Sequence, residues 1–344
     1  MRLLLVVNTS ASSVTARARV VIQKSLAADH DVTVAETSRR GHATRLAQGA
    51  ASRGVDCVVV LGGDGTLNEA ANGLAGSRCA LGVLPGGSTN VFARTIGMTN
   101  DPIEATGELL DALARGEDGI RKVGLGSVNG RRYLFHVGVG FDAAVVAQVE
   151  KRSALKRYLG HAFFAYTALD TWGRRFDRRH PHFSVRIERA VTVGADTVGV
   201  SAPKELVEVD DGYFAIILNT NPYTFLGERP FDVAPGTGLD NPLTAIVLRS
   251  LGAPTMLALA AAALRGEGGL KTSRKVSVTR DAVRVTLNAY KPVPYQVDGD
   301  YLGETSHLEF RWEPEDLRLV IPVATVPGAP ASEAWHRPIR PRLG

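Results

Sequence analysis

The sequence of 344 residues lacks any long hydrophobic run. Its longest apolar stretch, residues 251–264, contains Gly252 and Pro254 and is shorter than the roughly 20 residues that a membrane-spanning helix needs. The N-terminus has one positive charge, a very short apolar run and no small-residue cleavage site, so it predicts a first strand and not a secretion signal. We therefore expect a cytoplasmic protein without a transmembrane helix.

Cysteine and aromatic residues are also scarce. The two cysteines, Cys57 and Cys79, lie in apolar, strand-like segments, and their spacing fits neither a disulfide framework nor a metal site. We predict that both are reduced thiols in the core. Aromatic residues make up 6% of the chain, and no helix-turn-helix, zinc-finger or RNA-binding signature is present. Nucleic acid is therefore not an expected partner.

Neither sign of charge dominates, but the basic residues gather locally. The chain has 40 lysines and arginines against 35 acidic residues, which gives a net charge of +5, and basic clusters occupy residues 151–157 and 174–180. Such clusters attract anionic lipid headgroups or nucleotide phosphates, although a solvated basic face has the same composition. Charge alone does not choose among these partners.

The first hundred residues alternate between short apolar runs and helix-like stretches. Strands are expected at residues 3–8, 31–37, 56–61 and 79–84, and helices at 15–28, 42–53, 66–73 and 90–96. This alternation is typical of βαβ units with a mainly parallel sheet, which binds ligands at the carboxyl ends of its strands. We predict an α/β N-terminal domain over residues 1–122.

The rest of the chain has a different pattern. Short segments rich in β-branched residues and bounded by glycine, proline or aspartate predict an antiparallel sheet or sandwich. These segments are residues 132–138, 182–188, 214–219, 244–247, 275–279 and 283–287, with helical interruptions at 143–172 and 255–264. We predict a β-rich second domain over residues 123–307. Residues 323–344 hold four prolines and little apolar periodicity, and they predict a disordered tail.

The strongest local motif follows the apolar strand at residues 58–61. It reads Gly62-Gly63-Asp64-Gly65-Thr66 and leads directly into a helix. Glycines let the backbone approach a ligand, and the free N–H groups at a helix N-terminus favour phosphate. The motif is neither a Walker loop nor the dinucleotide fingerprint. The alternative without a ligand is a tight turn in which Asp64 only caps the helix.

A second glycine turn follows the next predicted strand. It reads Pro85-Gly86-Gly87-Ser88-Thr89-Asn90, and Arg94 lies one turn inside the following helix, where it could neutralise phosphate charge. Two phosphate-type loops on neighbouring strands predict a site for a nucleoside polyphosphate.

A pair of carboxylates lies far away along the chain, in Asp298-Gly299-Asp300. A hydroxyl that attacks a γ-phosphate must lose its proton, and a carboxylate is the usual acceptor in kinases. As a hairpin turn, however, Asp-Gly needs no function.

At these three motifs the sequence resembles the diacylglycerol kinase catalytic-domain family, soluble bacterial lipid kinases related to sphingosine kinases and, more remotely, to NAD kinases. The resemblance covers about residues 1–322. It implies an ATP-binding α/β domain and a β-rich domain that binds the lipid substrate, with a cleft between them. It also implies that a last strand, near residues 308–322, returns to the first domain.

The resemblance assigns roles residue by residue. Asp300 would accept the proton of the lipid hydroxyl, with Asp298 tied to a network of magnesium and Asp64. The nucleotide would contact Asn8, Thr9, Ser10, Ala11, Ser12, Thr37, Gly62, Gly63, Asp64, Gly65, Thr66, Leu67, Asn68, Ser88 and Thr89.

The sequence departs from the family pattern at four places, one of which is Ser88, where the family usually has threonine. The family more often has glutamate at the position of Asp300, and its first loop usually reads Asn-Pro, which Asn8-Thr9 replaces. Some relatives hold a structural magnesium ion, and the matching residues here are Gly238, Asp240, Asn241 and Leu243. Asn241 stands where a carboxylate is expected, which weakens binding of a hard cation.

The expected activity is that of an ATP- and Mg²⁺-dependent lipid kinase that converts diacylglycerol to phosphatidic acid at an anionic membrane surface. The docking face would lie around residues 151–179, and edge strands could pair two subunits into a homodimer. The alternatives are a sphingosine-type or other lipid kinase, a soluble kinase of the NAD kinase type, and a catalytically silent nucleotide or lipid sensor.

Overall fold

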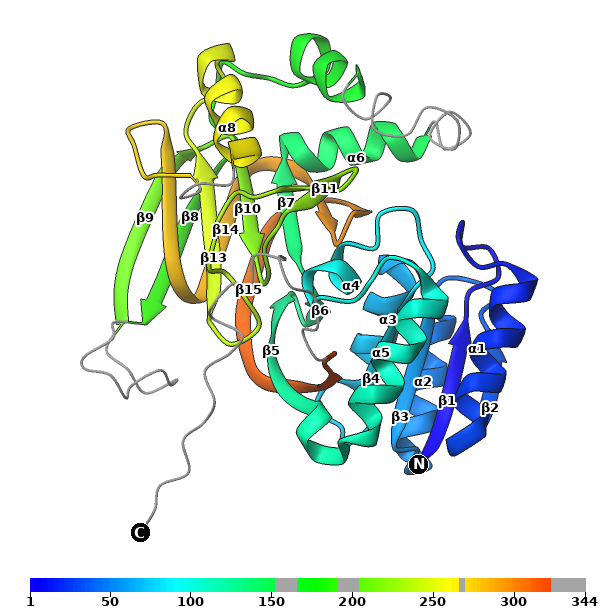
Figure 1. Ribbon diagram of the computed structural model, residues 1–344. Coiled ribbons are helices and arrows are strands. Elements are labelled where there is room, and N and C mark those ends of the chain that lie inside the picture. Colours follow the sequence, from blue (N-terminus) through cyan, green and yellow to red (C-terminus); the bar gives the residue numbers. More distant parts are fainter. Residues whose placement is uncertain (152–165, 191–203, 266–269, 323–344) are drawn as a thin grey trace.

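The computed structural model describes residues 1–151, 166–190, 204–265 and 270–322 (Figure 1). Its N-terminal region is a parallel sheet with the strand order β4-β3-β1-β2. The strands are β1 (Arg2–Val7), β2 (Asp31–Glu36), β3 (Cys57–Gly62) and β4 (Ala80–Pro85). All six residues of β3 and of β4 are buried, as expected for strands that are covered on both faces.

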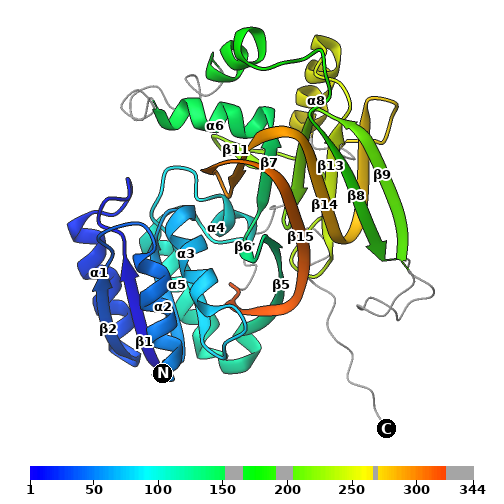
Figure 2. The ribbon, with the colours of Figure 1, turned by 180° about the vertical axis from the view of Figure 1, so that it is seen from behind.

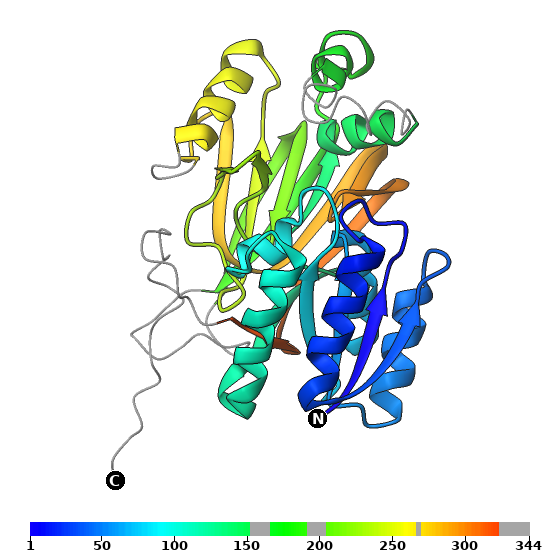
Figure 3. The same ribbon diagram turned by 45° about the vertical axis from the view of Figure 1, so that its right-hand side comes forward.

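Helices cover both faces of this sheet (Figure 3). The helices are α1 (Ala16–Asp29), α2 (His42–Ser52), α3 (Asp64–Leu74), α4 (Val91–Thr95) and α5 (Pro102–Ala114). The strand order reverses after β2, so right-handed crossovers place α2 and α3 together on one face and α1 with α5 on the other. Local side-chain caps start two of these helices: Thr15 accepts a hydrogen bond from the Ala18 N–H at α1, and Asp101, followed by Pro102, accepts from the N–H groups of Ile103 and Glu104 at α5.

The second region is β-rich and mainly antiparallel. It comprises η1 (Gly116–Gly119), β5 (Ile120–Val128), β6 (Arg131–Tyr133), β7 (His136–Gly140), α6 (Phe141–Lys151), η2 (Thr171–Arg175), β8 (Phe183–Ala190), β9 (Lys204–Gly212), β10 (Phe214–Leu218), β11 (Thr224–Leu226), β12 (Arg229–Phe231), β13 (Leu243–Leu248), α8 (Ala253–Arg265), β14 (Val276–Val297) and β15 (Asp300–Val320). Alternate residues of β7, β8, β10, β13, β14 and β15 point into a core of their own. The predicted fold class, an α/β domain followed by a β-rich one, is confirmed.

The long strand β15 joins the two regions, as Figure 2 shows. One end of β15 pairs with β14 in the second region, and at the other end Leu319 pairs with Leu81 of β4 in parallel. β5 pairs with β15 in antiparallel along the same stretch. The two regions therefore share one hydrogen-bonded sheet, and the last part of β15 extends the sheet of the first region.

Several expectations need correction or qualification. The strands expected at 275–279 and 283–287 are one strand, β14, because a left-handed residue, Asp281 with φ of 58°, lets the chain bend without leaving the sheet. The helix expected at 143–172 is α6 followed by a helical stretch at 166–175, and residues 152–165 lie outside the described residues. The tail at 323–344 also lies outside them. Cys57 and Cys79 are buried and free, as expected.

Within the described residues, no helix combines the length and apolar character needed to cross a bilayer.

Candidate functional site

Three loops converge at the carboxyl ends of β1, β3 and β4. The Asn8 side-chain amide donates to Thr66 Oγ1 over 2.8 Å, which ties the loop after β1 to the one after β3. The Gly86 N–H donates to the Gly62 carbonyl over 2.9 Å, and the Ser13 N–H donates to the Gly86 carbonyl over the same distance. The two glycine motifs predicted to hold phosphate are thus brought together with the first loop.

The glycines are needed because the two loops touch through their backbones. A methyl group placed on Gly86 would lie 2.8 Å from both Cα and N of Gly62, and one on Gly87 would lie 2.8 Å from Cα of Gly63. Helix α3 starts directly after Gly63, which has no side chain to cap it. The N–H groups of its first turn are therefore available to an anion, as a phosphate site requires.

Asp64 caps a helix, but not its own. Its two carboxylate oxygens accept hydrogen bonds from the N–H groups of Val91 and Phe92, each over 3.0 Å, and so cap α4. Burial raises the pKa of Asp64, the two backbone donors oppose that shift, and the nearby Asp300 carboxylate adds to it. The alternative in which Asp64 only caps α3 is wrong, because its carboxylate reaches across to the helix that follows the second glycine loop.

Asp298 is a buried clamp between the two regions. Its carboxylate accepts four hydrogen bonds: from the Asn68 amide over 2.7 Å, and from the N–H groups of Leu134, Phe135 and His136 over 2.7, 3.0 and 3.1 Å. Burial raises the pKa of Asp298 to about 6, although these donors act against the rise. The hydrogen bonds of Asp298 thus lead to Asn68 and β7, whereas the resemblance tied this residue to Asp64.

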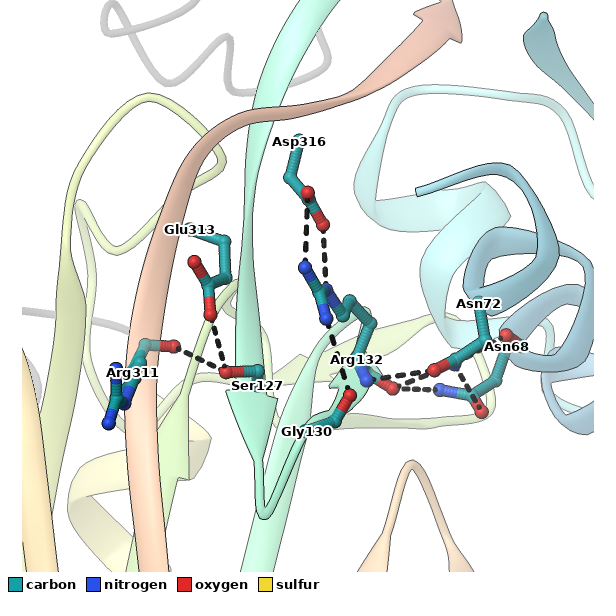
Figure 4. A network of polar contacts seen from close by, with 8 residues as sticks. All are labelled: Asn68, Asn72, Ser127, Gly130, Arg132, Arg311, Glu313 and Asp316. Carbon is teal, nitrogen blue, oxygen red and sulfur yellow. Dashed lines mark hydrogen bonds and ion pairs between the residues drawn. The ribbon is translucent and has the colours of Figure 1, made fainter. Parts of the chain in front are cut away.

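Asn68 belongs to a polar network beside this clamp, shown in Figure 4. Its amide also donates to the Arg132 carbonyl over 3.0 Å, and Asn72 both donates to that carbonyl and accepts from the Arg132 N–H. The Arg132 guanidinium in turn pairs with Asp316 of β15 over 2.8 Å. Asn68 is 1% exposed, so the structure places it in the connection between α3, β6 and β15.

Asp300 lies opposite the first glycine loop. A methyl group on Gly65 would lie 3.3 Å from Asp300 Oδ2, and the Asp300 side chain keeps a third of its surface exposed. Burial raises the pKa of Asp300, the Arg40 guanidinium 3.4 Å away lowers it, and Glu150 raises it. The turn that carries Asp300 therefore reaches the phosphate-type loop from the other region, 235 positions later in the chain (300 minus 65).

Two residues beside Asp300, Arg40 and Glu150, belong to none of the sequence motifs. Arg40 follows Thr37 on the loop after β2, and Glu150 lies near the end of α6. Glu150 accepts a hydrogen bond from the Tyr301 N–H over 3.0 Å and lies 3.9 Å from Arg40. The position of Arg40 just beyond a predicted contact residue is the one clue that could have indicated it.

The remaining predicted residues divide between the site edge and other contacts. The Thr37 N–H donates to the Val7 carbonyl, which holds Thr37 at the same sheet edge, and Ser88 is exposed there. Arg94 is directed elsewhere. It donates to the Gly227 carbonyl over 3.0 Å, pairs with Glu228 and lies 3.7 Å above the Phe225 ring, so it links α4 to the β11–β12 hairpin.

The two expected magnesium sites differ in how well they fit. In the loop after β12, the Arg121 guanidinium pairs with Asp240, and the Asn241 amide donates to the Gly236 carbonyl. A fixed positive charge on the only carboxylate of that set does not suit a divalent cation, so Gly238, Asp240, Asn241 and Leu243 do not fit the structural ion.

At the glycine loops the fit is better. No group of three or more His, Cys, Asp or Glu side chains that could hold a metal occurs in the described part of the chain. Mg²⁺ in nucleotide sites is usually held by one or two carboxylates, several waters and the phosphates themselves. Each Asp64 oxygen accepts one N–H bond and keeps a second lone pair, so Asp64 fits an ion that arrives with a nucleotide.

The contact between the glycine loops gives a stability prediction. Replacing Gly86 by alanine forces a methyl group against the Gly62 backbone, so we expect Gly86→Ala to lower the free energy of unfolding by about 1–3 kcal/mol. Gly107, inside α5 with open space around it, is the matched control. Gly107→Ala should leave stability unchanged or raise it by up to about 1 kcal/mol. Urea unfolding measures both, and equal effects would contradict the packing argument.

The clamp gives a pH prediction. Asp298 has a pKa of about 6 in the folded protein against 3.8 in the unfolded chain. Its contribution to stability is therefore fully present below pH 3.8 and is lost as the pH rises through 6, by about 3 kcal/mol in total. We expect Asp298→Asn to remove that part of the decline in unfolding free energy between pH 4 and 6. Urea unfolding at a series of pH values tests this, and identical pH profiles for both proteins would overturn it.

Most of the chain is similar to known diacylglycerol or lipid kinases. Residues 2–121 match the family described as "Diacylglycerol kinase catalytic domain". The chain is 28% identical over 287 residues to "Diacylglycerol kinase" from Bacillus subtilis, covering 82% of this chain and 84% of that protein. It is 31% identical over 238 residues to a Pseudomonas aeruginosa protein named "Probable lipid kinase YegS-like", covering 65% of this chain and 74% of that one.

A solved structure shows the same fold. The structure of a diacylglycerol kinase from Bacillus anthracis superposes with a TM-score of 0.63 at 22% identity, covering 94% of this chain and 98% of that one. The sequence relatives, the matched family and this fold agree with the convergence of two glycine loops and an Asp-Gly-Asp turn. The chain therefore belongs to the diacylglycerol kinase catalytic-domain family and is a lipid kinase, a phosphotransferase that acts on an alcohol group.

Proposed function

We propose that the protein transfers the γ-phosphoryl group of ATP to the primary hydroxyl of diacylglycerol, giving phosphatidic acid and ADP. The observation that supports this most directly is the position of Asp300 opposite Gly65. A carboxylate from the second region lies beside a loop of the first region that offers free helix N–H groups to phosphate.

ATP would lie across the carboxyl ends of β1, β3 and β4. The first turn of α3 and the glycine loops would hold the phosphates, with the Ser88 and Thr89 hydroxyls on the second loop as further donors. Asn8 to Ser12 and Thr37 line the same edge and would contact the rest of the nucleotide. When bound with ATP, Mg²⁺ would neutralise phosphate charge, and Asp64 is the side chain that would hold it.

Asp300 would take the proton of the lipid hydroxyl. At the same time the hydroxyl oxygen would bond to the γ-phosphorus, and the bond from that phosphorus to the ADP oxygen would break. The pKa of Asp300, raised by burial, favours proton acceptance, while the Arg40 guanidinium 3.4 Å away opposes that rise. The Arg40 side chain is 70% exposed, so it would also be open to a phosphate beside its contact with Asp300. Most of the rate enhancement in phosphoryl transfer comes from such alignment and electrostatics.

The β-rich region would shelter the acyl chains, and the enzyme would meet its substrate by peripheral contact with a membrane. Labelled ATP with a panel of diacylglycerol, sphingosine-type and other lipids, and with NAD, separates the alternatives. Transfer to diacylglycerol supports the proposal, and transfer to another acceptor reassigns the substrate. ATP binding without transfer to any acceptor indicates a sensor.

The role of Asp300 gives a mutational prediction. Asp300→Ala should lower kcat by about 10²- to 10⁴-fold, the usual contribution of a general base, while ATP affinity stays within about twofold. Asp300→Glu, which carries the residue that the family more often has, should keep a substantial part of the activity. Asp118→Ala, an exposed acid in η1, is the control and should be fully active. Activity in Asp300→Ala close to that of the wild type would show that another group accepts the proton.

A further inference from the structure

The two most exposed large apolar side chains among the described residues lie on two neighbouring helices. Leu257 of α8 is 71% exposed, and Leu169, in the helical stretch that leads into η2, is 68% exposed. The Trp172 indole N–H donates to the Leu251 carbonyl just before α8 over 2.8 Å and so connects the two helices. Figures 1 and 3 place both at the end of the molecule farthest from β1–β4.

Cations lie on or just beyond the same helical segments as these leucines. Arg174 is 82% exposed and pairs with Asp170 over 3.5 Å, and Arg178 lies 4.2 Å above the Trp172 ring. Arg265 at the end of α8 and Lys271 beyond it are exposed. The α8 segment itself contains no acidic residue. Apolar side chains within a basic rim match the interface of an anionic bilayer, in which leucines enter the acyl boundary and cations meet the headgroups. A second copy of the chain would bring an equally basic rim against this one.

We propose that this surface, formed by Leu169, Leu257 and Leu264 with Arg174 and Arg265, docks the protein on membranes that contain anionic phospholipid. The proposal rests on the proposed function, because a lipid acceptor has to be drawn from a bilayer. It also extends the docking face expected around residues 151–179 to α8, where the sequence showed only an apolar helix.

Vesicle binding tests the surface without any assay of catalysis. We expect the full chain to sediment with vesicles of phosphatidylcholine and phosphatidylserine, and Leu169→Glu and Leu257→Glu to lower the partition coefficient at least tenfold each. Leu206→Glu on β9, an equally drastic change at a side chain that is 53% exposed, should bind like the wild type.

The outcomes are distinct. Unchanged sedimentation of both variants would overturn the docking surface, and so would a stable dimer of the wild type that Leu257→Glu dissociates. Vesicle binding that depends on Leu257, in a protein inactive on every acceptor, would retain the surface and refute the proposed function.

A separate observation concerns the support of the Asp298–Asp300 turn. The Gly299 N–H donates to Gln296 Oε1 over 2.8 Å, and Gln296 Nε2 donates to Asp142 Oδ2 over the same distance. The Tyr223 hydroxyl donates to the other oxygen of Asp142. Gln296 is fully buried and Asp142 is 6% exposed, so this chain of hydrogen bonds runs through the interior from α6 to the turn.

The Gly299 N–H fixes which groups donate and which accept along this series of hydrogen bonds. A backbone N–H can only donate, so Gln296 must present its carbonyl oxygen to Gly299 and its NH₂ group to Asp142, which must accept. Space for Asp142 depends on Gly138, since a methyl group there would lie 1.8 Å from Asp142 Oδ2. The turn needs such support because Asp298 and Gly299 both have left-handed φ angles, 48° and 82°.

We infer that Asp142 and Gln296 are positioning residues that orient the Asp298–Asp300 turn and, through it, the Asp300 carboxylate. This inference rests on the proposed role of Asp300. An aspartate that only stabilised the second region would affect unfolding and leave the rate of the folded enzyme unchanged, whereas a small displacement of a catalytic group costs up to about 10²-fold in rate.

The test compares variants that break the hydrogen bonds between Asp142, Gln296 and Gly299 with variants that keep them. Gln296→Leu and Asp142→Leu should lower kcat by about 10- to 100-fold with the KM for ATP within about twofold, and they should speed hydrogen exchange at the Gly299 amide. Asp142→Asn should restore both, because its oxygen can accept from Gln296 while its NH₂ donates to the Tyr223 hydroxyl oxygen. Thr237→Val, which removes a buried hydroxyl pair with Thr244, is the control and should change neither.

Slow exchange and normal kcat in Gln296→Leu would overturn the inference. If the wild type phosphorylates no acceptor, the proposed function fails. Hydrogen exchange at the Gly299 amide still decides whether the hydrogen bonds from Asp142 and Gln296 orient the turn.

Discussion

The buried Asp298 carboxylate is the contact on which the geometry of this molecule depends. It gathers one side-chain donor from α3 and three consecutive backbone donors from residues 134–136, the turn before β7 and its first residue, so one side chain fixes a helix of the first region against the second region. Without it, four buried donors would lose their acceptor, and each such loss is costly. The same residue begins the turn that presents Asp300, which couples the relative position of the two regions to the geometry of the site.

Three aspartates that look equivalent in sequence have different surroundings. Asp64 caps α4, Asp298 is buried and joins α3 to β7, and Asp300 keeps a third of its side chain exposed and faces the glycine loops. The carboxylate of Asp298 accepts four hydrogen bonds and serves the geometry of the turn, whereas Asp64 and Asp300 keep lone pairs for chemistry. The site therefore combines one saturated carboxylate that positions the turn with two that can still accept a ligand or a proton.

Much of the fold could be predicted from the sequence because its signals are local. The run of valines before Gly62 and the glycines after it specify a buried strand, a tight turn and a helix start within ten residues. The cap of Asp64 on α4 could not be predicted, because it joins two loops that meet only after β3 and β4 pair. Arg40 and Glu150 could not be predicted for the same reason, because they come close to Asp300 only in the folded protein. The pairing of the Asp298–Asp300 turn with the glycine loops came from family resemblance alone.

The return of β15 to the first region has a consequence for biosynthesis. Leu81 of β4 pairs with Leu319, which the ribosome adds 238 residues later (319 minus 81). At ordinary rates of translation this separation corresponds to roughly 10–50 s. During that interval the nascent first region exposes an open sheet edge at β4, of the kind to which other strands can add. The nascent chain therefore depends on prompt completion of its last strand, or on a chaperone that covers this edge, to avoid pairing with the wrong partner.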